Sequence, residues 1–395
     1  MLTMKFFRAL IISARFKKIA WHPNIPCDVL IFDTEGSDNL IYCMPSRAKV
    51  YILRTREGMP LINSISFFLL LLMGLVKYRK PGRALYSSII KSLKPKVVIT
   101  YIDNSPVVGV IKNMFPTIPI LAVQNGTRWD LSRPNQPPLV FDHYFSFGSV
   151  ERDILSRGGH FAAHIYPIGS VRAGLFEEKY PALHKKEFDL CYISQYSALP
   201  FDVIDKWTHE MFISYYETGK HLFSVIVEFV EKNNLSLCVA MRSSLNSVSF
   251  EEERQYYSYQ GKNHIQHIPQ SPFSSYKTVQ ASRLSVTISS TLGYEMLGLG
   301  ERVIFAKDIK SVASVVMQGS WAENFVTYRL PELQRLYTLD YEEFSFKATE
   351  LLNMTDAEYM DYSRDARVYY MNYDSEQKPH QIIKNKIEVF LSKAN

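Results

Sequence analysis

Short apolar runs alternate along the chain with longer stretches that have the 3.6-residue periodicity of helices. In the first half, strand-like runs occupy residues 28–33, 49–53, 96–103, 119–124 and 143–148. A second series occupies residues 189–194, 235–242, 264–269, 284–290 and 302–306. Strands that alternate with helices indicate parallel sheets covered by helices. The pattern therefore predicts two doubly wound α/β domains.

A charged stretch without apolar periodicity, residues 172–187, separates the two series and is typical of a linker. We predict a Rossmann-like N-terminal domain over 1–172 and a second Rossmann-like domain over 187–375. Residues 376–395 read as a final helix that crosses back onto the first domain. Two such domains facing each other across a cleft form the GT-B fold of many glycosyltransferases and nucleotide-sugar epimerases.

Charge and motif content narrow the function. The formal charge is +6 over 395 residues, which suggests an anionic partner, but the chain has no compact Lys/Arg block of the kind that binds nucleic acid. The ten histidines and four cysteines lack metal-ligand spacing, so we expect neither a metal nor a cofactor. No GxGxxG, P-loop or GxSxG motif occurs, which argues against dehydrogenases, kinases and α/β-hydrolases.

The most apolar run, residues 65–76, is too short for the roughly 20 residues that span a bilayer. We interpret it first as a buried helix. The basic sequence KYRKPGR follows directly, so the alternative is a helix that docks on an anionic membrane face. The N-terminus has no cleavage site typical of a signal peptide, and the four separated cysteines indicate reduced thiols. We expect a cytoplasmic protein, with peripheral contact at the inner membrane as the alternative.

Ser289, Ser290 and Thr291 end an apolar strand and open a helix with the sequence TLGYEMLG. Hydroxyl groups and helix N–H groups at such a position favour a phosphate. Glu295, about one turn further on, could accept hydrogen bonds from ribose hydroxyls. The alternative, an ordinary helix cap with an exposed Glu295, is about as well supported by the sequence.

Further candidates for binding the nucleotide-sugar donor lie upstream of this strand. Arg242 ends another strand on the same predicted edge, where it could pair with a phosphate or remain a surface arginine. Ser275, Tyr276 and Lys277 lie at a predicted loop and helix start, suitable for contacts with the phosphate or the base.

In the first domain, Asp33, Glu35 and Asp103 lie at or just after strand ends that a parallel sheet brings to one edge. Two carboxylates across a cleft can serve as nucleophile and general acid/base in glycosyl chemistry, although Asp is also common in turns. Asp33 and the neighbouring polar residues are candidates for contacts with acceptor hydroxyls; these neighbours are Ser37, Asn104, Gln124, Asn125 and Arg128. The Asn-Gly pair in this group is also an ordinary turn signal.

Several segments together resemble bacterial surface-carbohydrate biosynthesis proteins: DVLIFDTEGSDNL, KPKVVITYIDNSPVVGVIKNMFPTIPILAVQNG, FDLCYISQY and SSYKTVQASRLSVTISSTLGYEMLGLGERVIFA. More distantly they resemble the retaining β-Kdo glycosyltransferases of capsule and lipopolysaccharide synthesis. That resemblance implies a metal-independent GT-B enzyme that transfers an ulosonic acid from a CMP-sugar to a glycan or glycolipid acceptor. It implies that the domain over 1–172 holds the acceptor and the catalytic residues, and that the domain over 187–375 binds the nucleotide sugar. It further implies Asp103 as nucleophile and Glu35 as general acid/base, with net retention.

One departure from that family leaves the donor open. Many CMP-sugar transferases have a His-Pro pair at a strand end of the nucleotide domain, whereas here that strand ends MRSS, and His22-Pro23 lies in the first domain. A UDP-sugar transferase and a nucleotide-sugar 2-epimerase or hydrolase are therefore alternatives. A scaffold subunit of a polysaccharide assembly complex is the non-enzymatic one.

Overall fold

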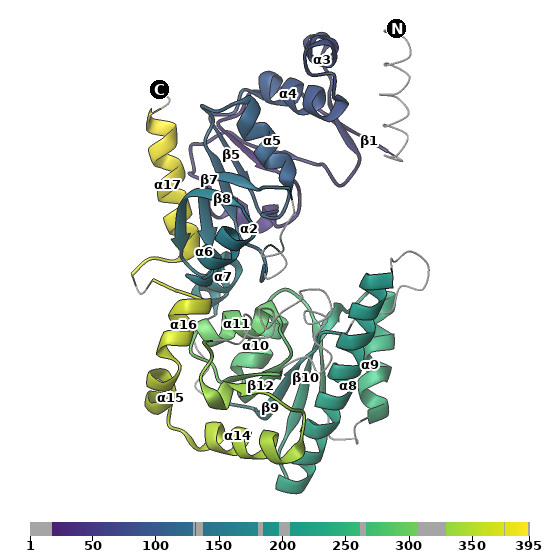
Figure 1. Cartoon of the computed structure of the whole chain (residues 1–395), viewed down its shortest axis with the longest axis vertical. Helices are drawn as coiled ribbons and strands as arrows, with labels where there is room; N and C mark the ends of the chain where they lie inside the picture. Colours follow the sequence, from purple (N-terminus) through teal and green to yellow (C-terminus); the bar gives the residue numbers. More distant parts are fainter. Residues whose placement is uncertain are drawn as a thin grey trace. The chain divides into compact units, whose positions relative to one another are not determined.

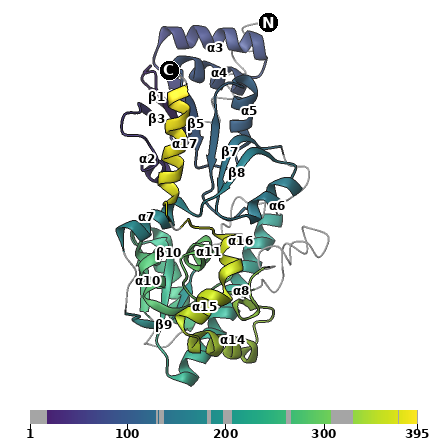
Figure 2. The same cartoon turned by 90° about the vertical axis from the view of Figure 1, so that its left-hand side faces the viewer.

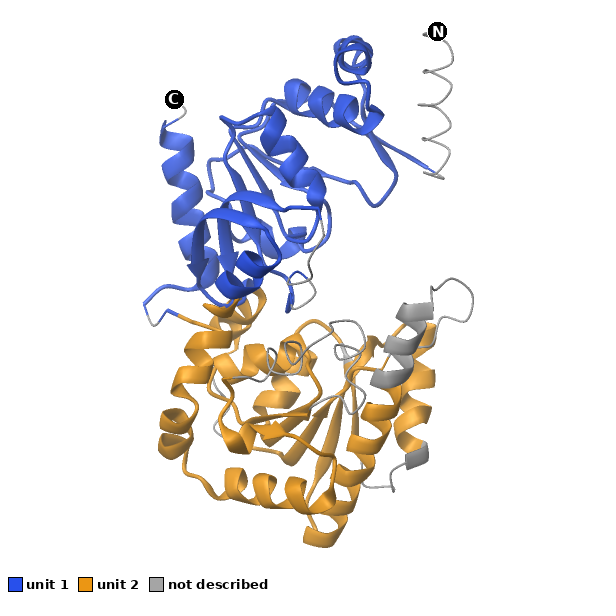
Figure 3. Cartoon of the chain, viewed as in Figure 1, with its two compact units in different colours: residues 1–147, 151–171, 374–395 blue, residues 148–150, 172–373 orange. Residues whose placement is uncertain are grey.

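The chain divides into two compact units (Figure 3). The first comprises residues 1–147, 151–171 and 374–395, and the second comprises residues 148–150 and 172–373. The computed structural model describes residues 18–128, 131, 137–180, 185–196, 206–260, 266–306, 329–374 and 376–393.

The first unit is built on a six-stranded parallel sheet of order β3-β2-β5-β6-β7-β8. Its central strands consist of Val, Ile, Leu and similar residues that are buried on both faces, as expected for a parallel sheet between two helical layers. The strands are β2 (Val29–Phe32), β3 (Val50–Leu53), β5 (Val97–Thr100), β6 (Ile120–Val123), β7 (Val140–Ser146) and β8 (Phe161–Pro167). A separate pair is formed by β1 (Ile19–His22) and β4 (Met59–Ile62).

The helices of the first unit include one from the far end of the sequence (Figure 1). In that helix, α17, the Phe390 ring lies 4.9 Å from the His143 ring of β7, and the Lys386 ammonium lies 5.0 Å from the Tyr166 ring of β8. The helices are α2 (Ser37–Ile41), α3 (Ile65–Tyr78), α4 (Pro81–Leu93), α5 (Pro106–Met114), α6 (Val150–Arg157) and α17 (Pro379–Lys393).

The expectation that residues 65–76 form a helix is correct, but the expectation that this helix is buried is wrong for one of its two sides. These residues do lie in a helix, α3, and its Phe67 is fully buried, but several of its large apolar side chains are exposed, Ile65 and Val76 among them. The apolar run therefore has a buried side and an exposed side, although the residues on both sides are largely apolar. No helix among the described residues is long and apolar enough to cross a membrane.

The second unit has its own six-stranded parallel sheet, of order β11-β10-β9-β12-β13-β14. The strands are β9 (Phe188–Ile193), β10 (Leu237–Ser244), β11 (Gln266–Gln270), β12 (Ser282–Thr287), β13 (Val303–Ala306) and β14 (Arg335–Leu336). Buried rings of Tyr192, Phe223 and Tyr257 pack edge to face or tilted in its core. The prediction of two doubly wound α/β domains is confirmed.

Helices flank this second sheet (Figure 1). They are α7 (Val171–Lys179), α8 (Lys206–Asn233), α9 (Val248–Gln260), α10 (Ser274–Gln280), α11 (Thr291–Gly298), α14 (Tyr341–Asn353), α15 (Asp356–Tyr362) and α16 (Arg364–Tyr370), with the short 3₁₀ helix η2 (Glu332–Gln334).

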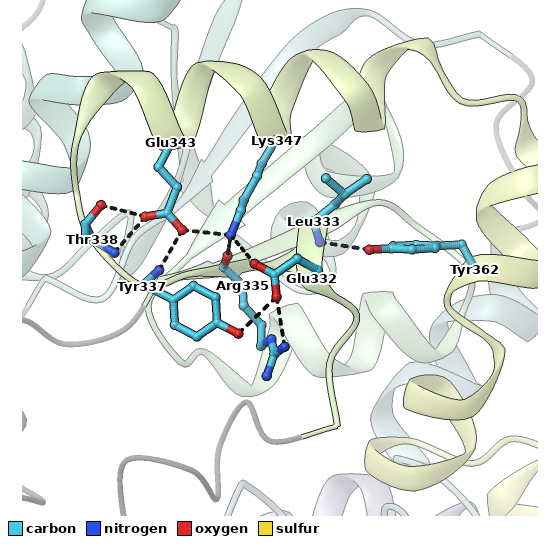
Figure 4. A network of polar contacts seen from close by, with 8 residues as sticks. All are labelled: Glu332, Leu333, Arg335, Tyr337, Thr338, Glu343, Lys347 and Tyr362. Carbon is cyan, nitrogen blue, oxygen red and sulfur yellow. Dashed lines mark hydrogen bonds and ion pairs between the residues drawn. The ribbon is translucent and has the colours of Figure 1, made fainter.

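A buried lysine joins η2, β14 and α14 (Figure 4). Lys347 is 5% exposed, and its ammonium lies 2.7 Å from Glu343 and 3.1 Å from Glu332 and donates to the Arg335 carbonyl at 2.6 Å. Burial disfavours the charged form of Glu343, but hydrogen bonds from Lys347, Thr338 and backbone N–H groups outweigh it and lower the pKa of this carboxyl. The network fixes the last strand of the sheet to the helix that follows it.

Replacing Lys347 by methionine should destabilise the protein by about 3–5 kcal/mol, because the largely buried carboxylate of Glu343 loses its cation. The matched control is Lys232→Met, which removes an exposed lysine from a similar i,i+4 pair with Glu228 and should leave the stability nearly unchanged. Urea unfolding of both variants measures the difference. Because the folded pKa of Glu343 is lowered, its stabilising contribution is present above its unfolded pKa and is lost as the pH falls through the folded pKa. Equal midpoints for the two variants would contradict a stabilising network.

Candidate functional site

Each sheet has one point at which the strand order reverses. In the second unit, β10 and β11 lie to one side of β9, and β12, β13 and β14 lie to the other, so the reversal falls between β9 and β12. In the first unit the reversal falls between β2 and β5. Ligands of open α/β sheets bind beyond the carboxyl ends of the strands at such a switch point. The segments that follow these four strands carry most of the polar residues singled out from the sequence.

At the switch point of the second unit, Gln195 connects the loops after β9 and β12. Its Oε1 accepts hydrogen bonds from the Ser289 N–H at 2.7 Å and from the Thr287 hydroxyl at 3.1 Å. The Ser290 N–H donates to the Thr287 hydroxyl oxygen at 3.3 Å. Sequence reasoning missed Gln195; its position directly after the first strand of the second series was the available signal.

The start of α11 follows this loop. Ser290 is the N-cap residue, but its side chain makes no capping hydrogen bond, and Ser289, Ser290 and Thr291 are all partly exposed. Gly293 lets the first turn approach β12 closely, because a Cβ there would lie 2.7 Å from the Thr287 methyl carbon. The Ser290 hydroxyl is therefore not used as a simple side-chain cap.

Glu295 and Tyr276 form a buried pair in the second unit. The Tyr276 hydroxyl donates to Glu295 at 2.6 Å, and both residues are 5% exposed. Burial, with the nearby Glu295 charge, raises the pKa of Tyr276 well above its ordinary value. The alternative that Glu295 is an exposed helical residue is wrong, and the structure links it to Tyr276.

The other donor candidates differ in exposure. Ser275 is buried in α10, whereas Lys277 is exposed and its ammonium lies 3.8 Å from the centre of the Tyr180 ring. Arg242 is exposed near the end of β10, and its Nη1 donates to the Tyr196 carbonyl at 3.2 Å. The exposed cation of Arg242 thus lies next to the loop that also carries Gln195.

A buried carboxylate that the sequence did not reveal holds this edge of the sheet. Glu253 is fully buried on α9 and accepts hydrogen bonds from the N–H groups of Arg242 at 2.9 Å and Ser243 at 2.7 Å. The Ser194 hydroxyl also donates to it. Within the acidic run EEER nothing distinguishes this glutamate from its exposed neighbours.

In the first unit, Asp33 shapes the loop after β2. Its backbone is left-handed, with φ of 91°, and its Oδ1 accepts from the Glu35 N–H at 2.9 Å and from Arg56 Nε at 3.0 Å. The hydroxyl of Thr55 donates to the other oxygen. Asp33 is buried, so the structure gives it a loop-forming role in place of the expected contact with an acceptor.

Glu35 remains accessible in this loop. Its side chain is 51% exposed and lies 3.4 Å from Arg56, a residue that sequence reasoning missed. Gly36, with φ of 65°, brings the loop against Tyr101 after β5, since a Cβ there would lie 2.0 Å from the Tyr101 ring. Ser37 at the start of α2 is partly exposed, and Asn104 after β5 is exposed. The loops after β2 and β5 are therefore in direct contact at the switch point.

Asp103 is enclosed by an arginine and a tyrosine. It has no exposed surface; its Oδ1 lies 2.8 Å from Arg128 Nε and 2.7 Å from Arg128 Nη2, and its Oδ2 accepts from the Tyr144 hydroxyl at 2.7 Å. Complete burial raises the pKa of Asp103, against the opposing effect of Arg128 and Tyr144. Arg128 Nη2 also donates to Asn125 Oδ1. Each oxygen of Asp103 accepts a hydrogen bond and the carboxylate has no exposed surface, so the nucleophilic role expected for Asp103 stays a prediction that requires its release from these partners.

Gln124 is likewise internal. Its Oε1 accepts from the Phe147 N–H at 2.7 Å, and its Nε2 donates to Glu151 at 2.6 Å and to the Gly126 carbonyl at 2.9 Å. It is 1% exposed, so it supports the loop after β6 and does not present its amide to a sugar. Within the described residues, no three His, Cys, Asp or Glu side chains come together in a group that could hold a metal ion.

The two units, each a parallel sheet flanked by helices, define a GT-B fold. The chain belongs to a family described as "putative O-antigen biosynthesis protein", which it matches over residues 122–386. The resemblance to bacterial surface-carbohydrate biosynthesis proteins is thereby confirmed at the level of the family. No curated protein sequence matches the chain.

Solved structures with the same fold are distant in sequence. The co-structure of S. aureus MnaA with UDP has a TM-score of 0.52 at 13% identity and covers 92% of this chain and 96% of MnaA. UDP-GlcNAc 2-epimerase of Methanocaldococcus jannaschii, in complex with UDP-GlcNAc and UDP, has a TM-score of 0.52 at 12% identity, covering 94% of this chain and 100% of its own. A variant of the wall teichoic acid polymerase TagF has a TM-score of 0.52 at 11% identity, with 94% and 90% covered.

Proposed function

We propose that this protein is a glycosyltransferase of bacterial O-antigen biosynthesis that uses a nucleotide sugar and transfers the sugar to a glycan or glycolipid acceptor. One observation carries the proposal: both sheets place polar side chains at their switch points. In the second unit these include an uncapped helix start, and in the first unit they include an exposed carboxylate. The family described for the chain supports the biosynthetic setting.

The start of α11 is the proposed phosphate site. Gln195 holds the Ser289 N–H, while the first turn of the helix and the hydroxyls of Ser290 and Thr291 supply hydrogen-bond donors at the positive end of the helix dipole. Arg242, exposed near the end of β10, would add a positive charge. These groups can stabilise a departing nucleotide phosphate without a metal ion.

The donor implied by the sequence resemblance is a CMP-linked ulosonic acid such as Kdo. A UDP-sugar is the second candidate, because two solved structures with this fold are described as complexes with UDP, one of them also with UDP-GlcNAc. With that donor, the protein would be a UDP-sugar transferase or a nucleotide-sugar 2-epimerase.

Glu35 is the proposed catalytic base. Its carboxylate is the exposed one of the three considered in the first unit, and the hydrogen bond from its N–H to Asp33 fixes its backbone. It would take the proton of the acceptor hydroxyl while that oxygen attacks the anomeric carbon and the nucleotide departs. This single displacement inverts the anomeric configuration. The retention implied by the sequence resemblance requires a covalent intermediate on a second carboxylate, for which Asp103 is the candidate. Ser37 and Asn104 lie after the same two strands and would contact the acceptor.

Thermal unfolding with CMP, CDP, UMP, UDP and GDP tests the donor site. A ligand that binds only the folded protein stabilises it by about 2.7 kcal/mol at 100 times its Kd. We expect a selective shift with CMP, and the double variant Ser290→Ala/Thr291→Ala should lose most of it. Thr355→Ala is the control, because it removes a true capping box at α15 and should lower the melting temperature without changing the nucleotide-induced shift.

Other results of the thermal unfolding experiment would change the assignment of the donor or of its site. A shift with UDP alone would support the second candidate. A shift that survives in Ser290→Ala/Thr291→Ala would contradict the phosphate site at α11, and the absence of a shift with any nucleotide would favour the scaffold alternative.

A further inference from the structure

The outward side of α3 is an uninterrupted apolar stripe. Its exposed residues recur at the spacing i, i+3, i+4, i+7, i+8 and i+11, which places them on one face of a helix. They are Ile65, Phe68, Leu69, Leu72, Met73 and Val76, which we call the α3 stripe. A solvent-facing side of a helix is normally polar, so this stripe requires an explanation.

The opposite side of α3 is already packed. Phe67 is fully buried, and Gly74 lies so close to α4 that a Cβ there would be 3.1 Å from the Ala84 Cα. Figures 1 and 2 show α3 next to α4 at the margin of the first unit. At one side the Trp21 ring of β1, itself half exposed, lies 6.4 Å from the Phe68 ring and widens the apolar surface.

The charge around the stripe has one sign. Residues 58–102 contain seven Lys and Arg and no Asp or Glu, so this segment carries a formal charge of +7 and the rest of the chain −1. The helical spacing of the stripe leads on to Arg79 and Lys80. Lys77, Arg79, Lys80 and Arg83 are all exposed, and none of them forms an ion pair with a described residue.

We propose that the α3 stripe and these cations form a docking surface for an anionic lipid membrane. A helix of 14 residues is about 21 Å long, so α3 would lie in the plane of the interface. Its apolar side chains would enter the boundary between headgroups and acyl chains, and the cations would contact lipid phosphates. Each Lys or Arg near an anionic bilayer surface contributes about 1 kcal/mol to such binding.

The charge of this surface favours a lipid membrane over two other partners, a second copy of the chain and the chain's own first 17 residues. A second copy of the chain, packed through the same face, would bring two +7 segments together without a compensating carboxylate from that segment. The first 17 residues of the chain carry Lys5, Arg8, Arg15 and Lys17 and no acidic residue, so they share the sign of the stripe's surroundings. An anionic lipid surface complements both the apolar stripe and its charge.

Vesicle flotation of the full chain tests the proposal. We expect binding to phosphatidylcholine vesicles that contain about one third phosphatidylglycerol, little binding to phosphatidylcholine alone, and loss of binding at high salt. Leu69→Gln/Met73→Gln should weaken binding about tenfold or more, because both exposed side chains leave the apolar surface. Arg79→Gln/Lys80→Gln should remove much of the preference for anionic vesicles.

Val248→Gln is the matched control, since Val248 is the most exposed large apolar residue among those described in the second unit and its replacement should leave flotation unchanged. Wild-type flotation of Leu69→Gln/Met73→Gln, or no flotation of the wild type, would overturn the proposal. Sedimentation velocity without lipid detects a dimer; if the same double substitution converts a dimer to a monomer and no variant floats, the stripe binds a second copy. The nucleotide-induced thermal shift should be the same in all these variants, so failure here is distinguishable from failure of the proposed enzymatic function.

Discussion

Replacement of Glu35 by glutamine is expected to lower the turnover number of sugar transfer about 10²- to 10⁴-fold, the usual contribution of a general base. Glutamine keeps the size of the side chain and can still face Arg56, but it cannot take a proton from the acceptor hydroxyl. The half-exposed side chain makes the substitution compatible with folding. The nucleotide-induced thermal shift should remain, because the proposed phosphate contacts lie in the second unit.

Glu57→Gln provides the matched control for this prediction. The Glu57 side chain is also 51% exposed and pairs with an arginine, Arg54, but it does not follow a strand at the switch point. Its turnover should equal that of the wild type. If both glutamine variants turn over normally in an assay with the nucleotide sugar identified by thermal shift, Glu35 is not the base.

The fold was predictable from the sequence because most strands are buried on both faces. Such strands leave continuous apolar runs, as in β2, β5 and β9, which the pattern located to within a few residues. The pattern did not reveal β8, whose residues are exposed or half-buried and include His164, nor the short β1 and β4. Edge strands and short pairs lack the two-sided burial that produces the signal.

Which loops meet at the site was also predictable, since parallel strands bring their carboxyl ends to one edge of a sheet. What each polar side chain contacts was not. Asp103 finds its partners 25 and 41 residues away, and Gln124 bonds to Glu151 at a separation of 27 residues. The direction in which a loop side chain points depends on such long-range contacts. The exposure of the side chain therefore distinguishes Glu35 from Asp33 and Asp103. Their common position at or just after strand ends could not distinguish them.

Asp103→Asn is expected to destabilise the first unit by about 3–5 kcal/mol, because Arg128 would keep its charge in a largely buried position without a counter-charge. We propose that Asp103 is a positioning residue that holds Arg128 against Asn125 beside the switch-point loops. On this interpretation it affects transfer only through Arg128. The alternative from the sequence resemblance is that Asp103 is released from Arg128 and attacks the anomeric carbon.

A double-mutant cycle of Asp103→Asn and Arg128→Gln distinguishes the two roles. If Asp103 acts through Arg128, the effects of the two substitutions on kcat/KM are not additive, and the double variant is no slower than the slower single variant. The double variant should also be more stable than Asp103→Asn, because no unpaired cation remains. If Asp103 is the nucleophile, Asp103→Asn abolishes transfer alone, whereas Arg128→Gln keeps measurable activity. Two results together would overturn the positioning role. These are a wild-type product that retains the anomeric configuration and a complete loss of transfer in Asp103→Asn. The enclosure of Asp103 by Arg128 and Tyr144 favours the first outcome, since a nucleophile needs an oxygen that can reach the substrate.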